Sequence, residues 1–302
     1  MRTLAHSAAS IFALTLALPA QPAASFHSNV ELVTVPVIVL DAKGAPVTDL
    51  TRDQFRVYDN DAPRVIDHLW VDVDLPLTLG ILIDASVSQS DQLDEHRTTV
   101  QAILKHLLRP ADQSFVISVD EEIRLWPDLS HPPAERFGTP CPKRPTSVPG
   151  AKPVSGCGAS PLWDAIYDAA HLKLRTATGN KAIVILTDGF DTGSTHIWQQ
   201  AADEALKAAS RVYAIHYASA SGNKYAPDLL RLVAETGGAS FTAPRGDLAP
   251  ILARLDADLR PHYVLGFRPE KLSGKLRHEL RVEVALPNVT VRARKGYFTP
   301  VP

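Results

Sequence analysis

Two short runs of apolar residues constrain the fold of this chain more than any other feature. Residues 77–83 (LTLGILI) end at Asp84, and residues 182–186 (AIVIL) end in Thr187 and Asp188. Continuous apolar runs of this length, bounded by polar residues, are typical of buried strands in a parallel sheet. Ligand sites in open α/β sheets lie at the carboxyl ends of such strands. We therefore predict both aspartates at one edge of one sheet.

Strand and helix patterns alternate around these two runs. Leu93, Val100, Ile103 and Leu107 recur with the 3.6-residue period of an amphipathic helix. Such alternation predicts an α/β fold with a doubly wound, mainly parallel sheet across residues 75–260. Further strands are expected at 114–119, 123–126, 212–216 and 240–242, and further helices at 197–210, 227–235 and 248–259. A helix that begins near residue 162 is expected to place Leu162, Ile166, Ala169 and Leu172 on its buried face.

The two ends of the chain are predicted to form strands only. Segment 26–74 is too short to bury a good core alone. We therefore expect segment 261–302 to complete it, so that a small β unit flanks an inserted α/β domain. Pro36 lies within the first expected strand, which favours an edge position because proline lacks a backbone N–H. The N-terminal strands are expected at 30–40, 55–58 and 65–71, and the C-terminal strands at 263–267, 278–286 and 289–293.

The first 25 residues have the pattern of a secretory signal peptide. Arg2 precedes an apolar stretch at 8–20, which is too short to span a bilayer, and small residues follow it. An uncleaved N-terminal anchor is the alternative. We expect an exported chain, periplasmic or extracellular, in which Cys141 and Cys157 form a disulfide or else remain as two free thiols. The net charge of −2 gives no electrostatic footprint for nucleic acid.

Polar residues that follow the predicted strands form a candidate metal site. Carboxylates and hydroxyls are hard oxygen ligands, which suit Mg²⁺, or Mn²⁺ or Ca²⁺, rather than zinc. The alternative is structural, because residues of these types also cap helices and form turns. Asp191 is expected to cap or support rather than to bind metal, and Trp163 is expected in the core. The predicted ligands are Asp84, Ser86, Ser88, Ser160 and Asp188.

This set resembles the metal-ion-dependent adhesion site of von Willebrand factor A (VWA) domains. Asp84, Ser86 and Ser88 match the family's Asp-x-Ser-x-Ser motif, Ser160 stands where the family has Thr, and Asp188 matches the third loop. Val87 replaces a frequent glycine. The segments LTRDQFRVYDN, HYVLGF and VRARKGYF are similar to secreted bacterial proteins called VWFA-related. The resemblance implies adhesion or assembly, in which a partner's Asp or Glu completes the coordination of the cation.

Two other functions remain open on the sequence. A metal-dependent hydrolase of the phosphatase type would have a general acid two residues after its nucleophilic Asp. Ser86 stands at that position. A serine hydrolase would have a G-x-S-x-G turn, which the chain lacks. The site could also be vestigial in a structural domain. We expect a binding module rather than an enzyme, with no membrane span in the mature chain.

Overall fold

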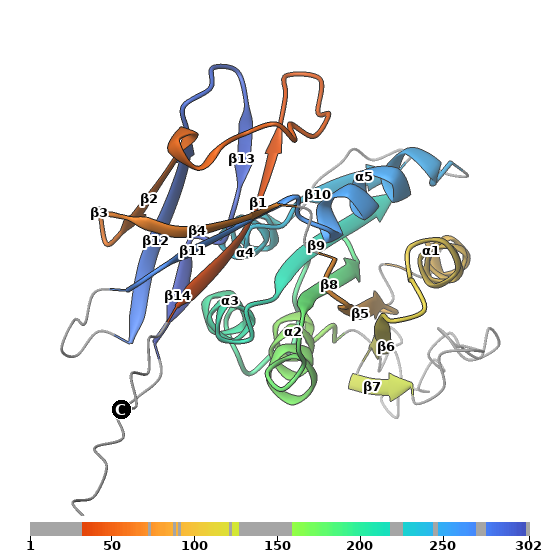
Figure 1. Cartoon of the computed structure of the whole chain (residues 1–302). Helices are drawn as coiled ribbons and strands as arrows, with labels where there is room; N and C mark the ends of the chain where they lie inside the picture. Colours follow the sequence, from red (N-terminus) through yellow and green to blue (C-terminus); the bar gives the residue numbers. More distant parts are fainter. Residues whose placement is uncertain are drawn as a thin grey trace, which may run out of the picture. The chain divides into compact units, whose positions relative to one another are not determined.

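The computed structural model describes residues 32–71, 74–86, 89, 92–120, 123–126, 159–217, 226–243, 247–269 and 276–299. These residues belong to one compact unit, Glu31–Pro302 (Figure 1). Residues 1–25, Ser88 and both cysteines lie outside the described residues, so the predictions of a signal peptide, a metal ligand and a disulfide stay predictions. No helix among the described residues is both long and apolar enough to cross a membrane.

A six-stranded sheet forms the centre of the α/β part. Its order is β10-β9-β8-β5-β6-β7, and every neighbouring pair is parallel except β6 and β7. The predicted fold class is confirmed. The chain order of the strands reverses between β5 and β8, and ligands bind at such a switch point in doubly wound sheets. The strands are β5 (Leu77–Asp84), β6 (Gln113–Val119), β7 (Ile123–Trp126), β8 (Asn180–Leu186), β9 (Arg211–Tyr217) and β10 (Ser240–Ala243).

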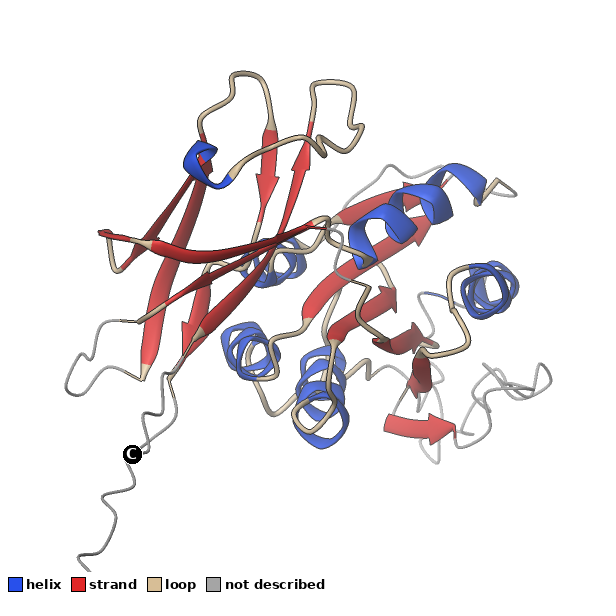
Figure 2. Ribbon diagram, viewed as in Figure 1, coloured by secondary structure: helices blue, strands red, loops and turns tan. Residues whose placement is uncertain are grey.

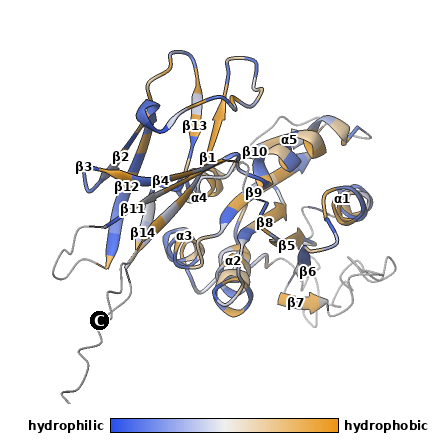
Figure 3. Cartoon of the chain, in the orientation of Figure 1, coloured by the Kyte–Doolittle hydropathy of each residue, from blue (hydrophilic) through white to orange (hydrophobic). Residues whose placement is uncertain are grey.

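Helices cover both faces of this sheet (Figure 2). Side chains alternate along β5, so Leu79, Ile81 and Ile83 enter the core cluster that contains α1 and α5, whereas Leu82 enters the opposite one. Asp84 has the same parity as Leu82, which places it on the α2 side. Figure 3 shows the hydrophobic colour along β5 and β8. The helices are α1 (Leu93–His106) and α5 (Ala249–Leu259) on one face, with α2 (Leu162–Asp168), α3 (Trp198–Lys207) and α4 (Pro227–Thr236) on the other.

The helix that follows Ser160 differs from the expected pattern. After α2 the chain continues as a π-helical segment, η3 (Ala169–Leu174). The wider turn changes the phase of the helix, so Leu174 is buried whereas Leu172 is 66% exposed. The prediction that Leu172 faces the core was therefore wrong.

Strands from both ends of the chain form a β unit with its own core. Its two sheets have the orders β13-β1-β11-β4 and β14-β12-β2-β3, and their shared cluster includes Phe55, Tyr263 and Phe267. The C-terminal strands thus complete the sheets of the N-terminal ones, while the exact domain boundaries stay predictions. The strands are β1 (Val33–Leu40), β2 (Phe55–Asp59), β3 (Ala62–Arg64), β4 (Ile66–Val71), β11 (Tyr263–Phe267), β12 (Arg277–Val284), β13 (Thr290–Arg292) and β14 (Gly296–Phe298), with a 3₁₀ turn η1 at Arg52–Gln54.

Pro36 does not mark an edge strand. β1 lies between β13 and β11 in its sheet. β13 pairs only with residues 38–40 of β1, and Pro36 pairs with Val264 of β11. The backbone at Pro36 therefore needs a strand partner on one side alone, which is how an interior strand accommodates a proline.

One carboxylate joins the two points at which the chain passes between the β unit and the α/β part. Asp112 accepts the backbone N–H of Leu77, at 2.8 Å, and the guanidinium of Arg260, at 2.5 Å. Burial raises the pKa of Asp112, but the hydrogen bonds from Arg260 and from the backbone N–H groups of Arg109 and Leu77 together outweigh burial and hold the pKa below its usual range. The first residue of β5 and the residue that follows α5 are thereby fixed to one side chain.

Candidate metal site at the edge of the sheet

Asp84 is the centre of the candidate site. It ends β5 and is fully buried. Its Oδ1 accepts hydrogen bonds from the backbone N–H of Ser86, at 3.0 Å, and from the hydroxyl of Ser160, at 3.2 Å. Its Oδ2 accepts the hydroxyl of Thr187, at 2.6 Å. The carboxylate thus connects β5, the loop before α2 and the end of β8.

The charge of this carboxylate is poorly balanced by the protein. Burial raises the pKa of Asp84; hydrogen bonds from Ser86 and Thr187 lower it, and the nearby charge of Asp188 raises it further. Among the described residues, no Lys, Arg or His forms an ion pair with Asp84 or Asp188. Buried carboxylates normally have a cationic partner or bind a metal. Two neighbouring carboxylates without one therefore fit a divalent cation.

The hydroxyl groups also fit a hard cation. A serine hydroxyl that donates its hydrogen to Asp84 keeps its oxygen lone pairs, which are then available to bind a cation. Ser160 is in this state, and it is 2% exposed. Among the described residues there is no group of three or more His, Cys, Asp and Glu side chains that could hold a metal. The predicted site is of a different kind, with two carboxylates completed by hydroxyls.

The loop after β8 positions Asp188. The N–H of Gly189 donates to Thr187 Oγ1 at 2.9 Å, and the N–H of Phe190 donates to Asp188 Oδ1 at 3.2 Å. Gly189 has φ +87°, and a Cβ there would lie 2.7 Å from Cδ2 of Leu229. Only glycine adopts this conformation so close to α4 without strain. The backbone that carries Asp188 is thereby fixed.

A β-bridge joins the loop before α2 to the loop after β8. The N–H of Ser160 donates to the carbonyl of Thr192 at 2.7 Å, and the N–H of Thr192 donates back at 3.0 Å. Asp191 Oδ1 accepts the N–H of Trp163 at 3.2 Å and the hydroxyl of Ser194. Asp191 therefore caps the start of α2, as predicted, and Trp163 lies in the core.

The structure thus brings together Asp84, Ser86 and Ser160, with Asp188 close enough to act on the charge of Asp84. Ser88 lies outside the described residues. Sequence reasoning missed Thr187, which makes the shortest hydrogen bond to Asp84. The parity of the strand could have revealed it, because Thr187 lies two residues after Ile185 on the face that also carries Asp84.

No protein-family profile matches the chain, and no curated protein matches it. Similar solved structures include von Willebrand factor type A from Catenulispora acidiphila, with 14% identity over 90% of this chain and 75% of that one, at a TM-score of 0.43. The SpRpn10 VWA domain has 16% identity over 59% of this chain and 94% of its own, at 0.38. Proximal thread matrix protein 1 from the mussel byssus has 13% identity over 65% of this chain, at 0.44, and the chain spans 50% of its length.

The order of the six strands, with helices on both faces and Asp84 beside the switch point, is the arrangement that the motif resemblance implies. The α/β part thus has the doubly wound fold that the resemblance to VWA domains implies, and it is called the VWA part below. Within this VWA part, the candidate metal residues come from the ends of the two strands that flank the switch point, β5 and β8, and from the loop before α2.

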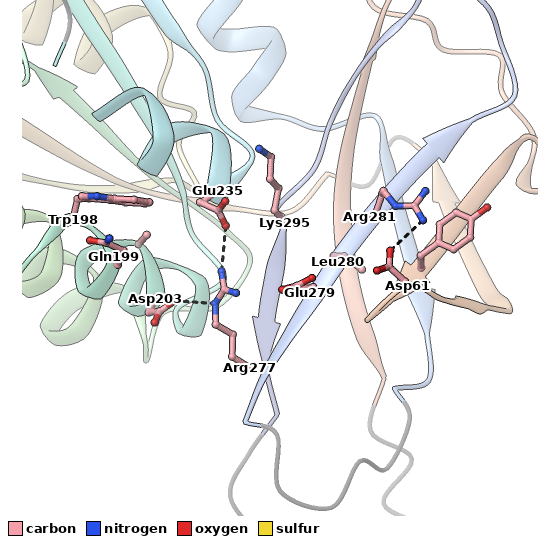
Figure 4. Close-up of a pocket in the computed structure, with 12 residues that line it drawn as sticks. Asp61, Trp198, Gln199, Asp203, Glu235, Arg277, Glu279, Leu280, Arg281 and Lys295 are labelled. Atoms are coloured by element: carbon pink, nitrogen blue, oxygen red, sulfur yellow. Dashed lines mark hydrogen bonds and ion pairs between the residues drawn. The ribbon is translucent and has the colours of Figure 1, made fainter. Parts of the chain in front are cut away.

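A groove of about 500 Å³ lies away from these residues, between the VWA part and the β unit (Figure 4). Arg277 of β12 reaches across it to Asp203 at 3.0 Å and Glu235 at 3.2 Å. Arg281 pairs with Asp61 and lies over the ring of Tyr58. Each of these three carboxylates has an arginine partner, whereas Asp84 and Asp188 form no ion pair among the described residues.

Proposed function

We propose that this chain is an exported binding module that engages a protein partner through a divalent cation. Asp84, Ser86, Ser88, Ser160 and Asp188 would hold Mg²⁺, Mn²⁺ or Ca²⁺, and an Asp or Glu of the partner would complete the coordination. The buried carboxylate of Asp84 carries this proposal, because three hydrogen-bonded groups orient it and no cationic side chain among the described residues balances it.

The charges of such a site explain its preference for an acidic ligand. Two carboxylates neutralise a divalent cation, and hydroxyls add oxygen ligands without charge. The cation therefore keeps affinity for one more anionic oxygen. Because the proposed ligands lie at the end of β5, in the loop before α2 and after β8, a partner would dock on the loops at this edge of the sheet.

Calorimetric titration with Mg²⁺, Mn²⁺ and Ca²⁺ tests the metal site directly. We expect heat of binding with wild-type protein and none with Asp84→Ala. Asp61→Ala is the matched control, because Asp61 lies in the β2–β3 turn of the β unit with a side chain that is 84% exposed. Absence of heat with wild type at millimolar metal would instead favour a structural domain with a vestigial site.

Capture of partners from the exported fraction tests the second half of the proposal. Immobilised wild-type protein should retain a partner in Mg²⁺ and release it in chelator, and Asp84→Ala should retain none. Equal retention with and without chelator would refute a bridge through the cation.

A further inference from the structure

One large apolar side chain lies exposed beside the candidate metal site. Phe190 is 53% exposed, and it follows Asp188 by two residues. Its backbone N–H donates to Asp188 Oδ1 at 3.2 Å, so the aromatic residue and the carboxylate share one short turn. Any partner that reaches a cation at Asp188 would therefore come close to this ring.

The backbone on both sides of Phe190 is fixed. Gly189 packs against Leu229 with no room for a Cβ. On the other side, Asp191 caps α2 and Thr192 pairs with Ser160. The ring is thus presented from a rigid turn, and binding to it would cost little loop ordering.

The spacing of the two groups defines the ligand. A residue of extended chain spans at most about 3.3–3.6 Å, so Asp188 and Phe190 are at most about 7 Å apart along the backbone. Residues i and i+2 of an extended peptide point to the same side and lie about 7 Å apart, which is enough to span two groups that share one short turn. One peptide can therefore direct a carboxylate to the cation and an apolar side chain to the ring.

We propose that Phe190 selects partners in which an acidic residue lies two positions from a large apolar residue in an extended segment. The carboxylate binds the cation, and the apolar side chain packs on the ring of Phe190. This inference rests on the proposed function and deepens it, because it assigns a specificity-determining residue outside the set of metal ligands.

Two synthetic peptides test the inference, Ac-GLGDGLG-NH2 and Ac-GGGDGGG-NH2, titrated in Mg²⁺ against wild type, Phe190→Ala and Leu172→Ala. Leu172 is also exposed, but it lies in η3, at the far end of the helix from Ser160. For wild type and Leu172→Ala we expect the leucine peptide to bind about tenfold more tightly, equivalent to about 1.4 kcal/mol. In Phe190→Ala the ratio should fall below twofold, while the heat of Mg²⁺ binding stays unchanged.

The outcomes separate this inference from the proposed function. The role of Phe190 is overturned if leucine raises the peptide's affinity equally in Phe190→Ala and wild type, or if it does not raise the affinity for wild type. In either case, Mg²⁺-dependent binding of the glycine peptide would still uphold the cation bridge. Failure of both peptides to bind wild type in Mg²⁺ overturns the bridge and this inference with it.

Discussion

Replacing Thr187 by Val removes the shortest hydrogen bond to Asp84 without changing the shape of the side chain. The hydroxyl donates to Asp84 at 2.6 Å and accepts the N–H of Gly189 at 2.9 Å. A hydrogen bond to a charged group contributes about 1.5–3 kcal/mol, and a buried donor left unpaired costs about 1–3 kcal/mol. The added methyl offsets about 0.8 kcal/mol. We therefore expect the free energy of unfolding to fall by about 2–5 kcal/mol.

Urea unfolding, followed by the fluorescence of the chain's four tryptophans, measures this loss. For a chain of this size, each kcal/mol lowers the melting temperature by roughly 2 °C, so a fall of about 4–10 °C should accompany it. Thr187→Ser is the control, since it keeps the hydroxyl and loses only a methyl group. Equal stability of the Val and Ser variants would refute the assignment of Thr187 as the hydroxyl that supports Asp84.

Three further predictions follow from charged side chains. Because burial raises the pKa of Asp84, its ionised form destabilises the folded state, so Asp84→Asn in chelator should be more stable than wild type at neutral pH. That difference should shrink as the pH falls through the raised pKa of Asp84 and vanish below about pH 4, where the carboxyl is protonated in the folded and the unfolded chain. Mg²⁺ should raise the melting temperature of wild type only. Arg277→Ala breaks two ion pairs of a side chain that is 37% exposed. The free energy of unfolding, measured in urea, should fall by only about 0.5–1 kcal/mol, and a fall above about 3 kcal/mol would contradict this. Burial raises the pKa of Glu204, but the hydrogen bond with His171 and its basic neighbours hold it below the ordinary value. The contribution of ionised Glu204 to stability is therefore present above its unfolded pKa and lost in acid. The stability advantage of wild type over Glu204→Gln should disappear below about pH 4, and an advantage that persists there would contradict this assignment.

The sequence predicted the VWA part well because its strands are continuous apolar runs. An apolar run of this length, bounded by glycines and polar residues, fits few structures other than a buried strand. The position of Asp84 then followed from the rule that parallel strands end at one edge. The same logic applied to Thr187, but a threonine next to an apolar run resembles an ordinary strand residue, because Thr has high β propensity. Its role depends on the distance to Asp84, which lies 103 residues away along the chain.

Other features could not be predicted because tertiary contacts decide them. The π-helical turn at Ala169–Leu174 leaves no mark in a 3.6-residue pattern, which is why Leu172 was assigned to the core. Pro36 indicated an edge strand, but only the length of β13 decides whether the proline loses a partner. In both cases the local rule was sound, and the neighbouring element determined the outcome.

The carboxylate of Asp112 has a mechanical consequence. It holds Leu77 and Arg260, the two ends of the VWA part, while β4 and β11 on the other side of these junctions pair with each other. A pulling force applied to β1 and β14 would be borne by the strand pairs of the β unit. As long as β4 and β11 stay paired, the VWA part carries no tension. A partner bound at its sheet edge would thus be held by a domain that stays unstretched while the chain around it is under load.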